Sequence, residues 1–397
     1  MKTRFQVLLP VMLLLALPTV VQAQFTFTTN NGAITITGYT GPGGDVTIPD
    51  STNGYPVTSI GDNAFNTSTN MTSVTIPITV TNIGISAFSY CFGLTKLAIP
   101  NGIVNIGQGA FWNCTSLTNV TIPSSVSQIG RYAFGSSRLT TVTISDGVRS
   151  IGQNAFESTH LSGVTIPGSV TNIEDHVFQD CFSLSSVTIA NGITSIADGV
   201  FSSCYVLSNV TLPSGITNIG QGSFSSCYIL TNFTVPSRLV HIGGSGFSGC
   251  NHLSSLTFPG SVTKIDSGAF YACYSLRSVY FMGNAPSVAS DVFSHGTNIV
   301  YYLPGTTNWG PTLAGRPAVL WNPSIQTANA SFGVQTNQFG FNITGTTNIP
   351  IVVEANTHLH NSNWTPLQTC TLTNGLIYFS DPQWINYPAR FYRLRSP

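Results

Sequence analysis

Residues 117–134 read Leu-Thr-Asn-Val-Thr-Ile-Pro-Ser-Ser-Val-Ser-Gln-Ile-Gly-Arg-Tyr-Ala-Phe, and variants of this stretch fill most of the chain. Its last residue recurs every 22 or 23 residues, and the copies that hold Phe134 and Phe156 are one residue short. A period this regular over eleven copies predicts a solenoid in which each copy forms one coil. The repeated phenylalanines are Phe65, Phe88, Phe111, Phe134, Phe156, Phe178, Phe201, Phe224, Phe247, Phe270 and Phe293.

Each copy predicts one short strand with one buried side. Val120 and Ile122 alternate with Asn119 and Thr121, so the apolar pair faces one way and the polar pair the other. Proline cannot donate to a strand ladder, so Pro123 ends the strand. A single coil buries too few apolar side chains to offset the entropy of ordering its backbone. The coils must therefore stack, with stability growing as copies are added.

The pattern L-x-x-V-x-I-P-x-x-V-x-x-I-G-x-x-A-F-x-x-C resembles the BspA-like leucine-rich repeats of bacterial surface proteins. The resemblance covers about residues 46–305. It implies a mainly β leucine-rich-repeat solenoid of about eleven coils, with parallel strands on one face. Because the family contains adhesins and other interaction proteins, it also implies a binding scaffold, without naming the ligand.

Seven of the eight cysteines lie three residues after a repeat phenylalanine. Coils stacked in register would give these cysteines parallel Cβ vectors, which suit a disulfide poorly. We therefore expect a ladder of buried, reduced thiols, with oxidised pairs as the alternative. The eighth, Cys370, lies outside the repeats and has no predictable partner. The predicted core ladder consists of Phe88, Phe111, Phe134, Phe178, Phe201, Phe224, Phe247 and Phe270 with Cys91, Cys114, Cys181, Cys204, Cys227, Cys250 and Cys273.

Both ends of the chain depart from the repeat. Lys2 and Arg4 precede an apolar run that ends in Val-Gln-Ala, which is typical of a cleaved secretory signal peptide. Further on, Asn-Asn-Gly between two alternating segments predicts a hairpin that caps the first coil. After the repeats, six short alternating segments predict a small antiparallel β-sandwich. The expected division is signal peptide 1–23, hairpin cap 24–45, solenoid 46–305, linker or C-terminal cap 306–323, and sandwich 324–397.

The composition argues against several functions. Only 7% of the 397 residues are charged and the formal net charge is zero, so we expect no nucleic-acid partner. The sequence contains no recognisable catalytic motif, and we expect no enzyme activity and no cofactor. The densest ionisable cluster, Glu174, Asp175, His176 and Asp180, is interpreted as a solvated turn, with a cation or a basic partner as the alternative. The group of Glu354, His358 and His360 makes a poor zinc site.

Three features are candidates for binding. Aromatic residues follow several cysteines (Phe92, Phe182, Tyr205, Tyr228 and Tyr274), and they could contact a sugar, anchor a partner protein or seal the coil edges. Arg390, Arg393 and Arg395 either form a contact for an anionic surface or an export machine, or protect an edge strand from aggregation. The outward strand positions form two polar rows, which β-branched threonine would also favour without any partner. The predicted binding residues are Thr121, Thr143, Thr165, Ser186, Thr188, Asn209, Thr211, Asn232, Thr234 and Thr257.

These features predict an exported, non-enzymatic interaction or adhesion protein, secreted or at the cell surface. Its expected partner is an extracellular or host protein, bound through a concave repeat face by hydrogen bonds rather than ion pairs. The alternative is a carbohydrate- or matrix-associated module in which the terminal sandwich binds glycans. No apolar stretch after the signal peptide reaches the length of a membrane span, so we expect no transmembrane anchor in the mature chain.

Overall fold

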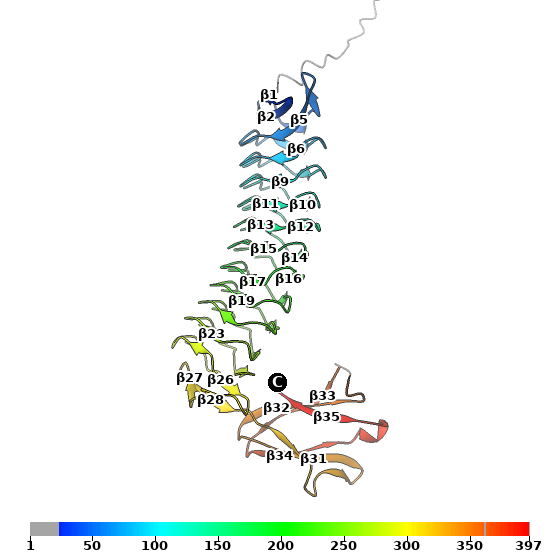
Figure 1. Cartoon of the computed structure of the whole chain (residues 1–397), viewed down its shortest axis with the longest axis vertical. Helices are drawn as coiled ribbons and strands as arrows, with labels where there is room; N and C mark the ends of the chain where they lie inside the picture. The colour runs from blue at the N-terminus through cyan, green and yellow to red at the C-terminus, as the bar shows by residue number, and fades with distance from the viewer. Residues whose placement is uncertain (1–23, 361–362, 397) are drawn as a thin grey trace, which may run out of the picture.

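The computed structural model describes residues 24–360 and 363–396, so the predicted signal peptide lies outside the described residues. The chain forms a long column of stacked coils, and a small module at its C-terminal end extends to one side (Figure 1). The described residues are almost entirely β, and η1 (Trp384–Asn386) is a single 3₁₀ turn. This architecture confirms the predicted solenoid followed by a small antiparallel β domain.

The first column of strands is formed by the segment of each repeat in which apolar and polar residues alternate. Its strands pair in parallel and in register, for example Thr165 with Thr188 and Thr188 with Thr211. The column consists of β3 (Gly44–Thr47), β6 (Met71–Thr75), β8 (Lys96–Ala98), β10 (Asn119–Ile122), β12 (Thr141–Ile144), β14 (Gly163–Ile166), β16 (Ser186–Ile189), β18 (Asn209–Thr211), β20 (Asn232–Phe233), β22 (Ser255–Phe258), β24 (Ser278–Phe281), β26 (Ile299–Tyr302) and β28 (Arg316–Leu320).

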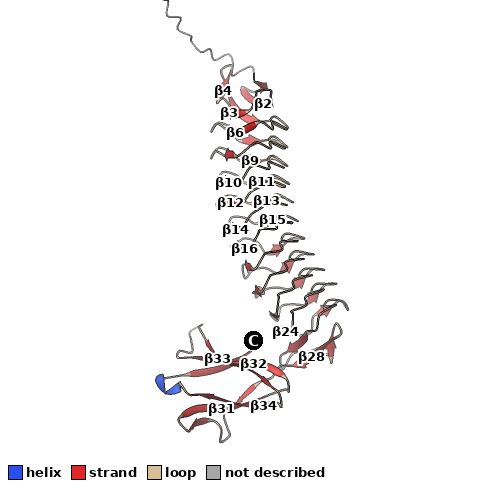
Figure 2. Cartoon of the chain, turned by 180° about the vertical axis from the view of Figure 1, so that it is seen from behind, coloured by secondary structure: helices blue, strands red, loops and turns tan. Residues whose placement is uncertain are grey.

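A second column runs beside the first, as both views show (Figure 1, Figure 2). The sequence predicted parallel strands on one face only, because most of these second strands have two residues and show no alternation. The column consists of β2 (Ala33–Tyr39), β5 (Tyr55–Ile60), β7 (Asn82–Ile83), β9 (Asn105–Ile106), β11 (Gln128–Ile129), β13 (Ser150–Ile151), β15 (Asn172–Ile173), β17 (Ser195–Ile196), β19 (Asn218–Ile219), β21 (His241–Ile242), β23 (Lys264–Ile265) and β25 (Ser287–Val288).

The repeated phenylalanines form a continuous stack through the interior. From Phe65 to Phe293, neighbouring ring centroids are 4.8–5.7 Å apart and the ring planes differ by 2–22°. Every one of these side chains is buried. Because each ring contacts the rings of the coils on either side, the stack transmits packing from coil to coil.

The seven repeat cysteines are buried and unpaired with one another. Each thiol donates to the carbonyl oxygen of the phenylalanine in the preceding coil, at 3.1–3.3 Å. Burial raises the pKa of Cys91 to about 12 and that of Cys181 to about 11, so both remain thiols at neutral pH. Where the position holds Ser137 or Thr159, the hydroxyl donates to the phenylalanine carbonyl of its own coil. The thiols therefore act as hydrogen-bond donors as well as small apolar groups.

Each coil turns tightly around its phenylalanine. In most coils the residues two positions before and two positions after it have positive φ, as at Ser86 (51°) and Tyr90 (59°). Many of these residues are not glycine, and Ala272 adopts φ 55°. The left-handed region costs a residue with a Cβ about 1–2 kcal/mol.

We expect Ala272→Gly to stabilise the chain by about 0.5–1 kcal/mol, because relief of the left-handed conformation exceeds the added chain entropy of glycine. Ala269→Gly is the matched control in the same coil. Ala269 is fully buried and has no positive φ, so its replacement should destabilise by about 1 kcal/mol. Urea unfolding of both variants measures the difference. Destabilisation of similar size in both would contradict the assignment of strain to Ala272.

Two different devices close the ends of the solenoid. β1 (Phe25–Asn30) pairs antiparallel with β2, and the rings of Phe25 and Tyr39 cover Phe65 at the end of the phenylalanine stack. β4 (Ser51–Thr52) pairs with β5 beside this hairpin. At the other end, β28 continues the first column by pairing with β26, and β27 (Thr312–Leu313) folds back on β28. β28 therefore adds a further strand to the solenoid within residues 306–323, for which a linker or a C-terminal cap was expected.

The terminal module consists of two facing sheets. Phe341, Ile351 and Phe379 lie in its core, where side chains of both sheets meet. One sheet contains β29 (Ser324–Gln326), β31 (Gln338–Thr344), β30 (Gly333–Gln335) and β34 (Leu376–Asp381). The other contains β33 (Thr365–Leu372), β32 (Ile349–Asn356) and β35 (Phe391–Arg395).

Candidate functional site: the strand face of the solenoid

The outward side chains of β10 to β22 form the surface that we call the strand face. Parallel pairing in register places Thr121 beside Thr143, and Thr165 beside Thr188 and Thr211. The predicted binding residues with described side chains are all exposed: Thr121, Thr143, Thr165, Ser186, Thr188, Asn209, Thr211, Thr234 and Thr257. Of Asn232 only the backbone is described, and it pairs with Asn209. The structure therefore brings the predicted residues together in two adjacent rows.

The strand face is interrupted by two shallow hollows that sequence reasoning missed. In the described chain no ladder joins β12 to β14, and a hollow of about 550 Å³ lies there, lined by Thr143, Thr165 and Thr188 among others. A second hollow, of about 420 Å³, lies between β20 and β22, which belong to different sheets, and is lined in part by Thr234 and Thr257. The first break directly follows the second of the two shortened copies, which is the signal that could have located it.

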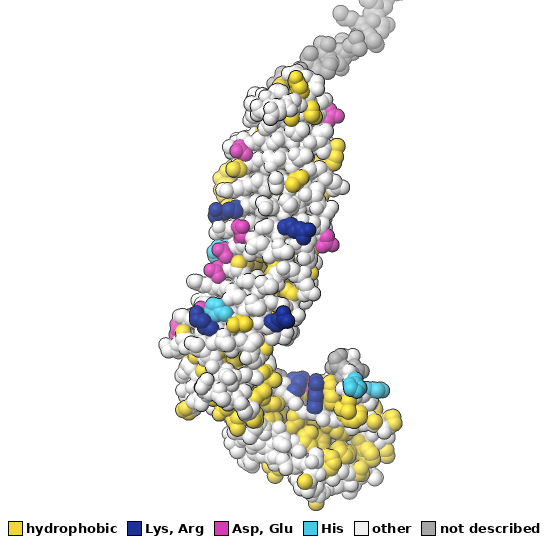
Figure 3. Space-filling model, in the orientation of Figure 1, with side chains coloured by type: hydrophobic (Ala, Val, Ile, Leu, Met, Phe, Trp, Pro, Cys, Tyr) yellow, Lys and Arg dark blue, Asp and Glu magenta, His cyan; other side chains and the backbone are white. Residues whose placement is uncertain are grey.

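The terminal module marks the end of the strand face. In the row that contains Thr257, the next two positions are Tyr280 and Tyr301, and both rings are buried in the core shared with the module. Trp321 donates from Nε1 to the carbonyl of Pro350 across the same junction, at 2.9 Å. Figure 3 shows hydrophobic side chains gathered at this junction and over the module, while the column above it carries few charges. The exposed rows therefore end at Thr257.

Comparison with known proteins agrees with this architecture. A family model described as a BspA type leucine rich repeat region matches residues 58–185 and 171–300. This chain belongs to the BspA-type leucine-rich repeat family. No match was found among curated proteins. The repeat pattern that indicated this family is thus confirmed.

Three similar solved structures are bacterial proteins. A leucine-rich cell surface protein of Faecalibacterium prausnitzii is 29% identical, covering 70% of this chain and 93% of its own, with a TM-score of 0.42. The T. pallidum leucine-rich repeat protein TpLRR is 30% identical, covering 53% and 89%, with a TM-score of 0.41. The pneumococcal vaccine antigen PcpA is 21% identical, covering 71% and 86%, with a TM-score of 0.48.

The aromatic residues after the cysteines are only partly continuous along this BspA-type solenoid. Phe182, Tyr205 and Tyr228 stack with centroids 5.0 Å apart, and they are 51%, 38% and 41% exposed. Phe92 and Tyr274 are also exposed but do not join this stack. Because the stacked rings cover one another, they present edges rather than open faces. Such a row suits contact with a protein better than it suits stacking on a sugar.

The predicted ionisable cluster has a structural role in the BspA-type turns. Glu174 Oε2 accepts from the backbone N–H of Gln153 at 2.9 Å, and Asp175 Oδ1 accepts from that of Asp198 at 3.1 Å. These carboxylates therefore satisfy turn N–H groups of neighbouring coils. Among the described residues there is no group of three His, Cys, Asp or Glu side chains that could hold a metal ion.

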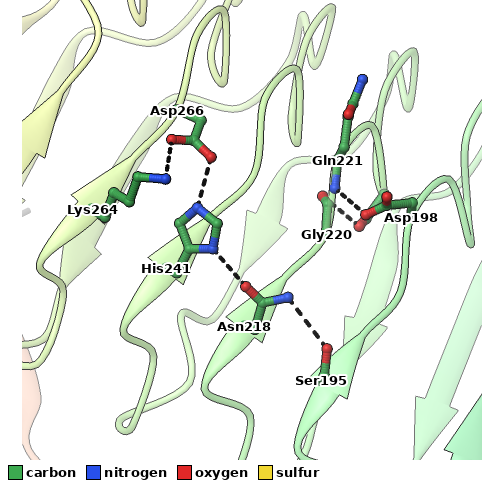
Figure 4. A network of polar contacts seen from close by, with 9 residues as sticks. Ser195, Asp198, Asn218, Gly220, Gln221, His241, Lys264 and Asp266 are labelled. Atoms are coloured by element: carbon green, nitrogen blue, oxygen red, sulfur yellow. Dashed lines mark hydrogen bonds and ion pairs between the residues drawn. The ribbon is translucent and has the colours of Figure 1, made fainter.

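A polar chain of side chains crosses the second column (Figure 4). Asn218 donates to Ser195, and its Oδ1 faces Nδ1 of His241 at 2.7 Å. Nε2 of His241 lies 2.8 Å from Asp266, which also pairs with Lys264 at 2.9 Å. The Lys264 and His241 contacts hold the pKa of Asp266 below its ordinary value. Since Ser195 is separated from His241 by Asn218, these residues do not form a Ser–His–Asp triad.

The C-terminal arginines are paired within the terminal module. The carboxylate of Glu354 is buried and contacts both Arg393 and Arg395. Glu354 is therefore not available to form a zinc site with His358 and His360. β35 is an edge strand, which agrees with the interpretation of its arginines as protection against edge-to-edge pairing.

Proposed function

We propose that this chain is an exported, non-enzymatic interaction protein that binds an extracellular or host protein through the strand face. One observation carries the proposal: nine exposed Ser, Thr and Asn side chains lie along seven successive coils without a charged residue among them. Such a surface offers many hydrogen bonds and little desolvation cost for charges. Membership of a repeat family that includes bacterial surface proteins supports an extracellular setting.

The contacts of the ionisable residues support the non-enzymatic part of the proposal. The acids and the histidine described above are engaged in contacts between coils. The cysteines are buried thiols with raised pKa, so they are poor nucleophiles. Among the described residues, no helix has the length and apolar character needed to cross a membrane.

Two paired lysine substitutions test the strand face. Thr188→Lys with Thr211→Lys places two charges on adjacent strands of the first column. Asn105→Lys with Gln128→Lys places the same charges on adjacent exposed positions of the second column. We expect the first variant to weaken binding at least tenfold, because burying unpaired charges in an uncharged interface is costly. The control variant should bind within about twofold of the unmodified chain.

The measurement is biolayer interferometry of the full chain against purified extracellular matrix and host-surface proteins. Circular dichroism establishes that both variants remain folded. Saturable binding that both variants retain, or lose equally, would place the site elsewhere than on the strand face.

A further inference from the structure

A cavity lies in the corner between the last coils and the terminal module. Its volume is about 130 Å³, and its walls are Tyr280, Tyr301, Trp321, Leu394 and Arg395, with neighbouring residues of the same strands. It begins one strand beyond the hollow that contains Thr257. In Figure 1, this corner is where the chain end, after β35, returns to the column. Junctions between domains are common places for small-ligand sites.

The cavity combines aromatic walls with one cationic group. Tyr280 and Tyr301 stack at 4.9 Å, and Trp321 meets Tyr280 edge-on at 6.4 Å. Burial raises the pKa of Tyr280, so its hydroxyl remains protonated and able to donate. Arg395 is the charged residue among the described side chains of the cavity wall.

The guanidinium of Arg395 has more N–H donors than its contacts within the chain use. Its Nε donates to Glu354, and its Nη1 donates to the Ser396 carbonyl at 2.6 Å. An arginine has five N–H donors, so three are left over from these contacts. Glu354 is shared with Arg393, which leaves the three side chains with a net charge of +1. The side chain of Arg395 is 42% exposed.

We propose that this corner binds a carboxylate-bearing sugar residue of an acidic polysaccharide. The guanidinium matches a carboxylate, and the aromatic ring edges with the Tyr280 hydroxyl offer apolar contact and a hydrogen-bond donor to a sugar ring. The volume lies below the ~300–1,000 Å³ of sites for drug-sized ligands, which suits one ring. The adjoining hydroxyls of Ser255 and Thr257 are uncharged hydrogen-bonding groups that the next sugar residue can reach. This site is separate from the strand-face function and does not depend on it.

The test uses isothermal titration calorimetry of the full chain with oligogalacturonate and, as the neutral counterpart, its methyl ester. We expect the acid form to bind at least tenfold more tightly than the ester. Arg395→Gln should remove most of that preference. Arg393→Gln is the matched control, because Arg393 contacts the same carboxylate but stacks on Trp364 at 4.4 Å, and it does not line the cavity. It should bind the acid form within about threefold of the unmodified chain.

Additional variants and an acidic peptide probe distinguish a sugar site in this corner from a loss of structure and from a peptide-binding site. Both arginine variants lose their ion pair with Glu354, so a purely structural effect would lower the melting temperatures and the affinities of both. Thr188→Lys with Thr211→Lys should leave oligogalacturonate binding within about threefold. Equal affinity for acid and ester, equal losses in the two arginine variants, or binding of an acidic peptide in place of the oligosaccharide would overturn the proposal.

Discussion

Replacing Phe178 by alanine should destabilise the solenoid by about 3–5 kcal/mol. The ring is fully buried and stacks between Phe156 at 5.5 Å and Phe201 at 5.7 Å, so its removal leaves a cavity in the middle of the ladder. Each coil contacts only its neighbours, so contacts elsewhere in the chain cannot compensate for the packing lost around this coil. Urea unfolding monitored by circular dichroism should therefore show a lower midpoint. The unfolding curve should also separate into two transitions, one for the coils on each side of Phe178.

The matched control is four residues away. Phe182→Ala removes the same side chain from the same coil, but this ring is 51% exposed and contacts only Tyr205 in its stack. We expect a loss below about 1 kcal/mol. If the two substitutions destabilise the chain equally, the phenylalanine stack is not the element that couples the coils.

Glu354→Gln should destabilise the terminal module by about 2 kcal/mol. The carboxylate is 3% exposed and is contacted by Arg393 and Arg395, so the amide leaves two arginines without a counterion. Breaking a fully buried pair costs about 3–5 kcal/mol, and the half-exposed arginines reduce this cost because water can solvate them. Tryptophan fluorescence can report the transition, since Arg393 lies over Trp364. Asp146→Asn, which removes an exposed acid from the solenoid, should have little effect.

The same carboxylate predicts acid sensitivity of the module. Burial alone would raise the pKa of Glu354, but hydrogen bonds from Arg395 and Arg393 outweigh it and hold the pKa below the ordinary value of 4.5. Its contribution is therefore complete above about pH 4.5 and is lost as the pH falls through the lowered value. The free energies of unfolding of the unmodified chain and of Glu354→Gln, measured between pH 7 and 3, should become equal at the acid end. Parallel curves over that range would show that Glu354 does not carry the effect.

The two polar rows of the strand face could be predicted from the sequence. Alternation placed Thr188 and Thr211 outward, and the fixed period placed them side by side, because stacked identical coils repeat every position at the strand spacing. The hollow between β12 and β14 could not be derived in the same way. It lies next to the second shortened coil and depends on how that coil packs against the following one, which no single repeat encodes.

The hydrogen-bond partners of the cysteines and the burial of two tyrosines could not be predicted from the sequence. Period and chemistry indicated buried thiols, but the acceptor of Cys204 is the carbonyl of Phe178, which lies 26 residues earlier and becomes a neighbour only when the coils stack. Likewise, Tyr280 and Tyr301 occupy the row of Thr257, yet nothing local indicates that the terminal module covers them.

The sequence by itself determined the repeat, the inward and outward sides of the first column, the phenylalanine ladder and the family, because each is a short-range pattern repeated at a fixed spacing. Only the tertiary structure decided the second column, the thiol hydrogen bonds, the hollows and the corner beside Arg395. These features arise from contacts between segments far apart in the chain, whose geometry is set by the packing of whole coils and of the module against them.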